Sequence, residues 1–154
     1  MHIILKENNE RHVVLVSPIE DVDFKKLTVK RYFFNWKKLK DESSIFKLTL
    51  ANSKDILGLI ALVAHPEERI EIKLLAVSAE NVGKNKQFDR IAGCLIAFAG
   101  REAIRKFQNY PALSLIPKTE LKQSYIRKYG MIDAGWQLYL EDAPLLRLVK
   151  EYLS

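Results

Sequence analysis

Short turns between three apolar segments restrict the topology of this chain more than any other feature of its sequence. The segments cover residues 45–50, 56–64 and 70–77, and turn-forming residues separate them. A parallel connection needs roughly a dozen residues or more, so these strands must form an antiparallel meander. Gly58 lies inside the second strand, where a glycine indicates a bulge or a close approach of another part of the chain.

A polar loop follows the meander and opens into a helix that runs from about residue 90 to residue 107. Ile91, Leu95 and Phe98 recur on one face of that helix. The next strand, residues 110–117, is bounded by prolines. A strand, a helix and a second strand of one sheet form a right-handed crossover, so we expect this strand to lie parallel to residues 70–77.

The C-terminal part of the chain continues the alternation of helices and strands. Thr119 is expected to cap a short helix that ends at Tyr129, with Gly130 in the left-handed conformation behind it. Residues 131–141 are predicted to form a strand, and a C-terminal helix begins at residues 142–144, where a proline is tolerated in the first turn.

Composition indicates one folded domain over residues 1–154. Hydrophobic residues make up 48% of the chain and charged residues 29%, which is typical of a globular protein and argues against disorder. Residues 1–24 hold two short apolar runs that form a hairpin or two edge strands. We therefore predict an α/β (α+β) fold in which helices flank a mixed, mostly antiparallel central sheet.

The net charge of +6 predicts an anionic ligand or partner, although it does not choose between a nucleotide, a nucleic acid and a membrane surface. A single cysteine, Cys94, excludes an intrachain disulfide and fits a reducing cytoplasm. Residues 1–12 lack the apolar core of a signal peptide, and the longest apolar run is too short to span a bilayer. The histidines are too scattered to indicate a metal site. We expect a cytoplasmic protein without a metal and without a membrane.

Residues 25–40 are rich in lysine and aromatic residues. Such a segment suits a nucleic-acid surface, because cations bind phosphates and rings stack on bases. It equally suits an amphipathic segment whose rings pack inward and whose lysines are solvated. We favour packing, because no nucleic-acid-binding motif accompanies the segment.

The start of the predicted helix has the properties of a phosphate-binding site. The first turn of a helix has N–H groups without intrahelical partners and carries partial positive charge. Lys84, Lys86 and Arg90 add formal positive charge to the same place.

Two patterns in this region resemble the Gcn5-related N-acetyltransferase (GNAT) superfamily. Gln87-x-x-Arg90-x-Ala92 is similar to the coenzyme A loop of that family, and residues 125–131 are similar to its Y-x-k-x-G-F segment. Arg90 stands where the family has its first loop glycine. Its guanidinium therefore either pairs with the diphosphate or marks a domain that has lost the coenzyme. We favour retained binding, because Lys84, Lys86 and the helix start remain.

The resemblance implies an acetyl-CoA-dependent N-acetyltransferase whose sheet contains a splayed pair of parallel strands. The first of these strands would offer backbone groups to pantetheine, the loop would hold the pyrophosphate, and two lysines would reach the phosphates of the adenosine end. By position, the cofactor-binding residues are Leu75, Ala76, Val77, Lys84, Lys86, Gln87, Arg90, Ile91, Ala92 and Gly93.

Two residues are candidates for acid–base chemistry. Tyr125 is the candidate acid for the departing thiolate, since the ordinary pKa of a phenol is about 10. The family tyrosine sits four residues before the glycine, where this chain has Ile126, so Tyr125 also fits a packing role. Glu71 is the candidate general base, and the alternative is an exposed strand carboxylate.

The acceptor is expected to be an amine on a small molecule or a protein. Two alternatives stay open: a catalytically degenerate GNAT-like module that binds a partner protein, and a toxin-type transferase that acts on charged tRNA. An exposed Trp136 or Tyr139 would suit the edge of a homodimer.

Overall fold

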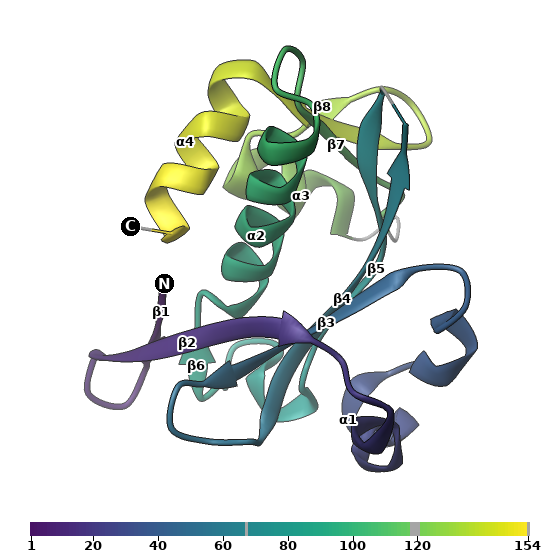
Figure 1. Cartoon of the computed structure of the whole chain (residues 1–154). Coiled ribbons are helices and arrows are strands. Elements are labelled where there is room, and N and C mark those ends of the chain that lie inside the picture. Colours follow the sequence, from purple (N-terminus) through teal and green to yellow (C-terminus); the bar gives the residue numbers. More distant parts are fainter. Residues whose placement is uncertain (67, 118–120, 154) are drawn as a thin grey trace.

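The structure is a computed structural model that describes residues 1–66, 68–117 and 121–153. Its strands form one mixed sheet in the order β6-β1-β2-β3-β4-β5-β7-β9-β8 (Figure 1). The strands are β1 (His2–Leu5), β2 (Glu10–Pro18), β3 (Ser44–Leu50), β4 (Ile56–His65), β5 (Arg69–Val77), β6 (Phe88–Asp89), β7 (Ala112–Leu115), β8 (Ile132–Asp133) and β9 (Leu138–Glu141).

The helices connect these strands and cover both faces of the sheet. They are η1 (Asp21–Lys26), α1 (Val29–Tyr32), η2 (Trp36–Leu39), η3 (Ala79–Asn81), α2 (Ile91–Lys106), α3 (Lys122–Tyr129) and α4 (Asp142–Leu153), where η marks a 3-10 helix.

The strand pairing confirms the predicted topology. β1 and β2 form the N-terminal hairpin, and β3, β4 and β5 form the antiparallel meander. The crossover connection through α2 places β7 beside β5 in parallel orientation, with Ile70 opposite Leu113 and Ile72 opposite Leu115. The predicted mixed, mostly antiparallel sheet is therefore present.

Two bulges redirect the side chains of the central strands. Leu57 is the extra residue where β4 pairs with β3, and Lys73 is the extra residue where β5 pairs with β4. One inserted residue moves every later side chain to the other face of the sheet. Gly58 follows the first bulge, and a Cβ there would lie 2.9 Å from Ile91 Cγ2. The glycine therefore permits the close approach of α2, as its position in the sequence predicted.

The helices α2 and α4 pack side by side on one face of the sheet (Figure 1). Gly93 of α2 lies against α4, since a Cβ on this residue would be 2.2 Å from Cε1 of Tyr152. The opposite face is covered by η1, α1 and η2, where Tyr32 and Trp36 pack on Leu59 and other residues of β4. The packing interpretation of residues 25–40 is confirmed for these two rings.

Two predictions for the C-terminal half need correction or lie outside the described residues. The segment 131–141 is not one strand but the hairpin β8–β9, because Gly135 takes a left-handed φ of +93° and reverses the chain. Gly130 ends α3 with φ +72°, as predicted. The cap expected from Thr119 lies outside the described residues.

Candidate active site

The parallel pair β5–β7 opens at the bulge. Its pairing ends at Ile72 and Leu115, and the next residue of β5 is the extra residue Lys73. A bulge bends its strand and increases the local twist. From Lys73 to Val77, β5 has no strand partner on that side within the described residues. Its backbone N–H and C=O groups are therefore available to a ligand.

A cavity of about 390 Å³ occupies this opening. Most of its lining is apolar, and β5 contributes more residues to it than any other element. The lining residues are Tyr32, Phe33, Phe34, Ile72, Lys73, Leu74, Leu75, Ala76, Val77, Val82, Ala92, Leu115, Ile116, Pro117, Leu121 and Tyr125.

The cavity reaches both faces of the sheet. Leu75 and Val77 pack with the core on the α2 face, whereas Leu74 and Ala76 pack with the core on the α1 face. All four residues line the cavity. The cavity is therefore bordered by residues from both faces of the sheet.

On the α2 face, the cavity extends to the first turn of α2, where Ala92 lines it. The first bond within this helix runs from the N–H of Cys94 to the carbonyl of Arg90, at 2.9 Å. The N–H groups of residues 91–93 precede this bond and lie outside the intrahelical ladder. Such a helix start favours an anion.

Arg90 takes the conformation that a glycine would adopt with ease. Its φ is +84°, which costs an L residue roughly 1–2 kcal/mol. The guanidinium is turned away from the cavity: it donates to the carbonyls of His2 and Glu151, at 3.3 and 3.2 Å, and lies 4.4 Å from the ring centre of Tyr152. These contacts occupy the guanidinium of Arg90. It is therefore not positioned to pair with the diphosphate, which was one of the two roles considered for it.

The short strand before α2, β6, ends in an acidic residue that the sequence analysis missed. Asp89 Oδ1 accepts a hydrogen bond from the N–H of Arg90, and it lies 2.9 Å from Nζ of Lys86. Burial raises the pKa of Asp89, but the bonds from Lys86 and Arg90 outweigh it, so the net pKa is lowered. Lys86 is thus paired already, while Lys84 and Gln87 have exposed side chains. The carbonyl of Gln87 accepts from the N–H of Lys6 at 2.9 Å.

Tyr125 lies on α3 and lines the cavity. Burial raises the pKa of its phenol above the ordinary value of 10.0, so the hydroxyl keeps its proton at neutral pH. Within the described part of the chain this hydroxyl has no hydrogen-bond partner. Both Tyr125 and the neighbouring Ile126 pack against the core, but Ile126 is not among the residues that line the cavity. Of the two adjacent positions weighed in the sequence, Tyr125 is therefore the one on the cavity.

Glu71 is not among the cavity residues. Its Oε1 lies 2.8 Å from Nε2 of His65 on the neighbouring strand. In the register of β5 and β7 it stands opposite Ser114, whose Oγ accepts from Nε of Arg69 at 2.8 Å. Of the predicted site residues, the opening thus brings together Leu75, Ala76, Val77, Ala92 and Tyr125.

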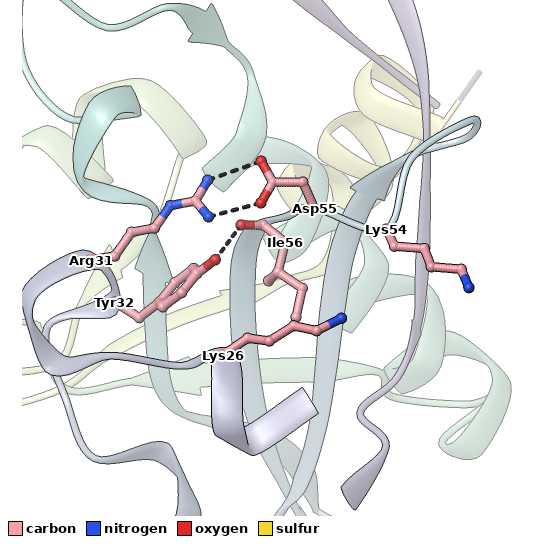
Figure 2. Close-up of a pocket in the computed structure, with 6 residues that line it drawn as sticks. All are labelled: Lys26, Arg31, Tyr32, Lys54, Asp55 and Ile56. Carbon is pink, nitrogen blue, oxygen red and sulfur yellow. Dashed lines mark hydrogen bonds and ion pairs between the residues drawn. The ribbon is translucent and has the colours of Figure 1, made fainter. Parts of the chain in front are cut away.

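An ion-pair network anchors α1, which forms one wall of the cavity. The guanidinium of Arg31 donates two bonds to the carboxylate of Asp55, at 2.8 and 3.0 Å, and a third to Glu80 at 2.7 Å. The hydroxyl of Tyr32 donates to the carbonyl of Ile56 at 2.7 Å (Figure 2). Arg31, Tyr32, Asp55 and Ile56 lie around a smaller cavity of about 220 Å³, together with Lys26 and Lys54.

The wall that follows this anchor is formed by Phe33 and Phe34. Sequence reasoning treated the aromatic run as packing and did not assign these two rings to a site. The available signal was their place between two further rings of the sequence, Tyr32 and Trp36, which the structure buries.

Three further observations concern metal binding, membrane spans and the cysteine. Among the described residues there is no group of three or more His, Cys, Asp or Glu side chains that could hold a metal ion. None of the helices in the described ranges is both long enough and apolar enough to cross a membrane. Cys94 is buried, its Sγ lies 3.4 Å from the carbonyl of His2, and burial raises its pKa to about 11.

Several solved structures share this fold at low sequence identity. A GNAT family acetyltransferase from Elizabethkingia anophelis with acetyl-CoA bound is 17% identical, has a TM-score of 0.58, and matches over 84% of this chain and 98% of that chain. Mutant forms of the spermidine/spermine N-acetyltransferase SpeG from Vibrio cholerae are 14% identical, with a TM-score of 0.60 over 91% and 96% of the two chains. A mutant of the toxin AtaT, bound to acetyl-CoA and to the C-terminus of the antitoxin AtaR, is 13% identical, with a TM-score of 0.62 over 88% and 97%.

No protein-family model matches the sequence, and no curated protein matches it. The structural likeness is nevertheless extensive, and the parallel pair β5–β7 opens as the family resemblance implied. The chain has the fold of the Gcn5-related N-acetyltransferases.

Proposed function

We propose that this protein is an acetyl-CoA-dependent N-acetyltransferase. The observation that carries the proposal is the cavity in the opening between β5 and β7, which extends from the first turn of α2 to the opposite face of the sheet. Similar structures with acetyl-CoA bound support the choice of coenzyme.

The coenzyme would lie on the α2 face. Leu75, Ala76 and Val77 offer an unpaired strand edge to an extended pantetheine arm. The N–H groups of residues 91–93 suit the pyrophosphate, and the exposed Lys84 suits a further phosphate. Each charge-assisted bond contributes about 1.5–3 kcal/mol, so two or three of them supply much of a micromolar affinity. Arg90 contributes its backbone conformation rather than its side chain.

The acceptor would enter from the α1 face. Acetyl-CoA supplies a thioester: the acceptor nitrogen forms a bond to the acetyl carbon and loses a proton, while the carbon–sulfur bond breaks and the sulfur gains one. Tyr125 holds a proton at its hydroxyl and lines the same cavity, which suits it to protonate the sulfur. Glu71 lies outside the cavity lining, so as a general base it would act through water.

Calorimetry with acetyl-CoA tests the proposal. We expect binding by the unaltered protein and at least a tenfold weaker affinity in Ala92→Phe, because the new ring fills the cavity at the helix start. Ala143→Phe is the matched control, since Ala143 is the second residue of α4 and is exposed. No detectable binding by the unaltered protein at about 1 mM ligand would refute the proposal.

A binding module without catalysis is the first alternative. Acetyl transfer to an amine that is lost in Tyr125→Phe, while that variant still binds acetyl-CoA, would exclude it. Coenzyme binding without transfer to any amine offered would favour it.

Transfer to the amine of charged tRNA is a second candidate. Exposed lysines flank the aromatic wall of the cavity, among them Lys30, Lys37 and Lys38. Cations in this segment would bind the phosphates of an RNA acceptor. We expect tRNA binding that weakens steeply as salt rises and that falls in Lys37→Gln/Lys38→Gln. Absence of tRNA binding at low salt would remove this candidate.

A further inference from the structure

The aromatic wall of the cavity has features that core packing does not require. Phe33 is 52% exposed and Phe34 is 38% exposed, whereas Tyr32 beside them is 1% exposed. Phe33 also has a φ of +69°, which is unfavourable for a bulky side chain. Strain of this kind persists where the surrounding structure enforces it, and it is typical of functional sites.

The anchor of α1 enforces this conformation. Arg31 ties the helix to Asp55, and Tyr32 ties it to the carbonyl of Ile56 (Figure 2). Arg31 also donates to Glu80. Phe33 follows directly and closes the helix, with its N–H donating to the carbonyl of Val29 at 2.7 Å. Both rings are thereby fixed at the cavity, although they remain accessible to a ligand.

The charged side chains that line the cavity are of one sign. Of the described residues that line it, Lys73 is the one with a full charge at neutral pH, and no Asp or Glu is among them. Lys73 is exposed, and no ion pair is recorded for it within the described residues. A second ammonium group on the acceptor would meet a like charge here, whereas an anionic group would be attracted.

We propose that the acceptor is a primary amine that carries an aromatic group and an anionic group. Phe33 and Phe34 stack on the aromatic group, and Lys73 binds the anion. This inference rests on the proposed function and specifies its substrate class. It excludes polyamines as preferred acceptors, although a spermidine/spermine acetyltransferase shares the fold.

Acetyl transfer to three amines tests the inference. L-Phenylalanine has the aromatic ring and the carboxylate, phenethylamine lacks only the carboxylate, and spermidine has neither. We expect kcat/KM to fall in that order, by about tenfold for each step, the size expected for one good contact.

Variants separate the two contributions. Lys73→Gln should abolish the advantage of phenylalanine over phenethylamine. Phe34→Ala and Phe33→Gly should raise KM for both aromatic amines about tenfold without changing acetyl-CoA affinity. Phe33→Gly should keep or raise the melting temperature, because glycine accepts the positive φ. Val29→Ala is the control, since Val29 is an exposed apolar residue of the same helix outside the cavity lining.

The outcomes are distinct from those of the proposed function. Spermidine acetylated as well as phenylalanine, or an unchanged preference in Lys73→Gln, would overturn the inference while the acetyltransferase assignment stands. A protein that does not bind acetyl-CoA in calorimetry would overturn both.

Discussion

Tyr125 is the predicted site residue whose chemistry the cavity affects most directly, because its half-buried side chain lines the cavity and its hydroxyl keeps its proton. We expect Tyr125→Phe to lower kcat by about 10²-fold or more and to leave the affinity for acetyl-CoA nearly unchanged. Burial raises the pKa of this phenol above 10.0, so kcat of the unaltered enzyme should not fall through loss of this proton below about pH 10. The measurement is a pH–rate profile of both proteins. Tyr110→Phe, at an exposed site, is the control, and a full kcat in Tyr125→Phe would contradict the acid role.

Gly93 is constrained by packing rather than by chemistry, since the ring of Tyr152 already fills the space that a side chain at this position would need. We expect Gly93→Ala to lower the free energy of unfolding by about 1–3 kcal/mol through overpacking. In the background of Tyr152→Ala the same change should cost much less, and urea unfolding of the four proteins measures this coupling. Additive effects would show that the two residues do not compete for space.

The contacts of the Arg90 side chain were not predictable from the sequence. The sequence pattern around Arg90 located the helix start correctly, because a loop and the helix that follows it are local features. Its contacts, however, come from His2 at one end of the chain and from Glu151 and Tyr152 at the other. No short-range pattern contains them. The same reasoning explains why Asp89 was overlooked, since its role depends on the folded position of Lys86.

At the scale of elements, the meander, the crossover and α2 were predictable because apolar runs and turn lengths fix them. The opening of β5 and β7 was expected only through the family resemblance. Its physical origin is the bulge at Lys73, which depends on register between two strands and leaves no periodic signal in one of them. The aromatic wall was missed for a related reason: α1 is a single short turn held by distant residues rather than by its own propensity.

The anchor of α1 makes the stability of this element depend on pH. Arg31 lowers the pKa of Asp55 from the ordinary value of 3.8; for Glu80, burial raises the pKa, but the bond from Arg31 contributes to a net lowering from 4.5. A lowered pKa means that the unfolded chain takes up protons first, so the stabilisation is present above about pH 4.5 and is lost as the pH falls further.

We therefore expect Arg31→Ala to reduce the free energy of unfolding by about 1–2 kcal/mol at pH 7, with a difference that shrinks below about pH 4. Denaturant unfolding of both proteins at several pH values from about 7 down to about 4 measures this difference in the free energy of unfolding. Lys40→Ala is the control, because the pair of Lys40 with Asp21 is exposed and should contribute little. A difference between Arg31→Ala and the unaltered protein that did not vary with pH would contradict this assignment.

At the scale of the whole molecule, both ends of the chain support the proposed coenzyme site. β1 pairs with β6, which directly precedes the start of α2, and α4 packs along α2. Figure 1 shows the two termini near the same end of α2. The helix start is therefore braced by the first and last elements described, which explains how an arginine is kept at positive φ in the loop.

The net charge of +6 also acts on the whole molecule, and it separates a local phosphate site from general attraction. We expect the Kd of acetyl-CoA to rise several-fold between about 50 and 500 mM salt, as screening weakens its interaction with the cations. Lys84→Gln should reduce this salt dependence more than Lys25→Gln, although each change removes one charge from an exposed lysine. Lys25 lies on η1, away from the start of α2. Isothermal titration at several salt concentrations measures all three proteins. If both variants reduced the salt dependence of the Kd equally, the phosphates would respond only to the total charge of the protein. Lys84 would then make no specific contact with the coenzyme.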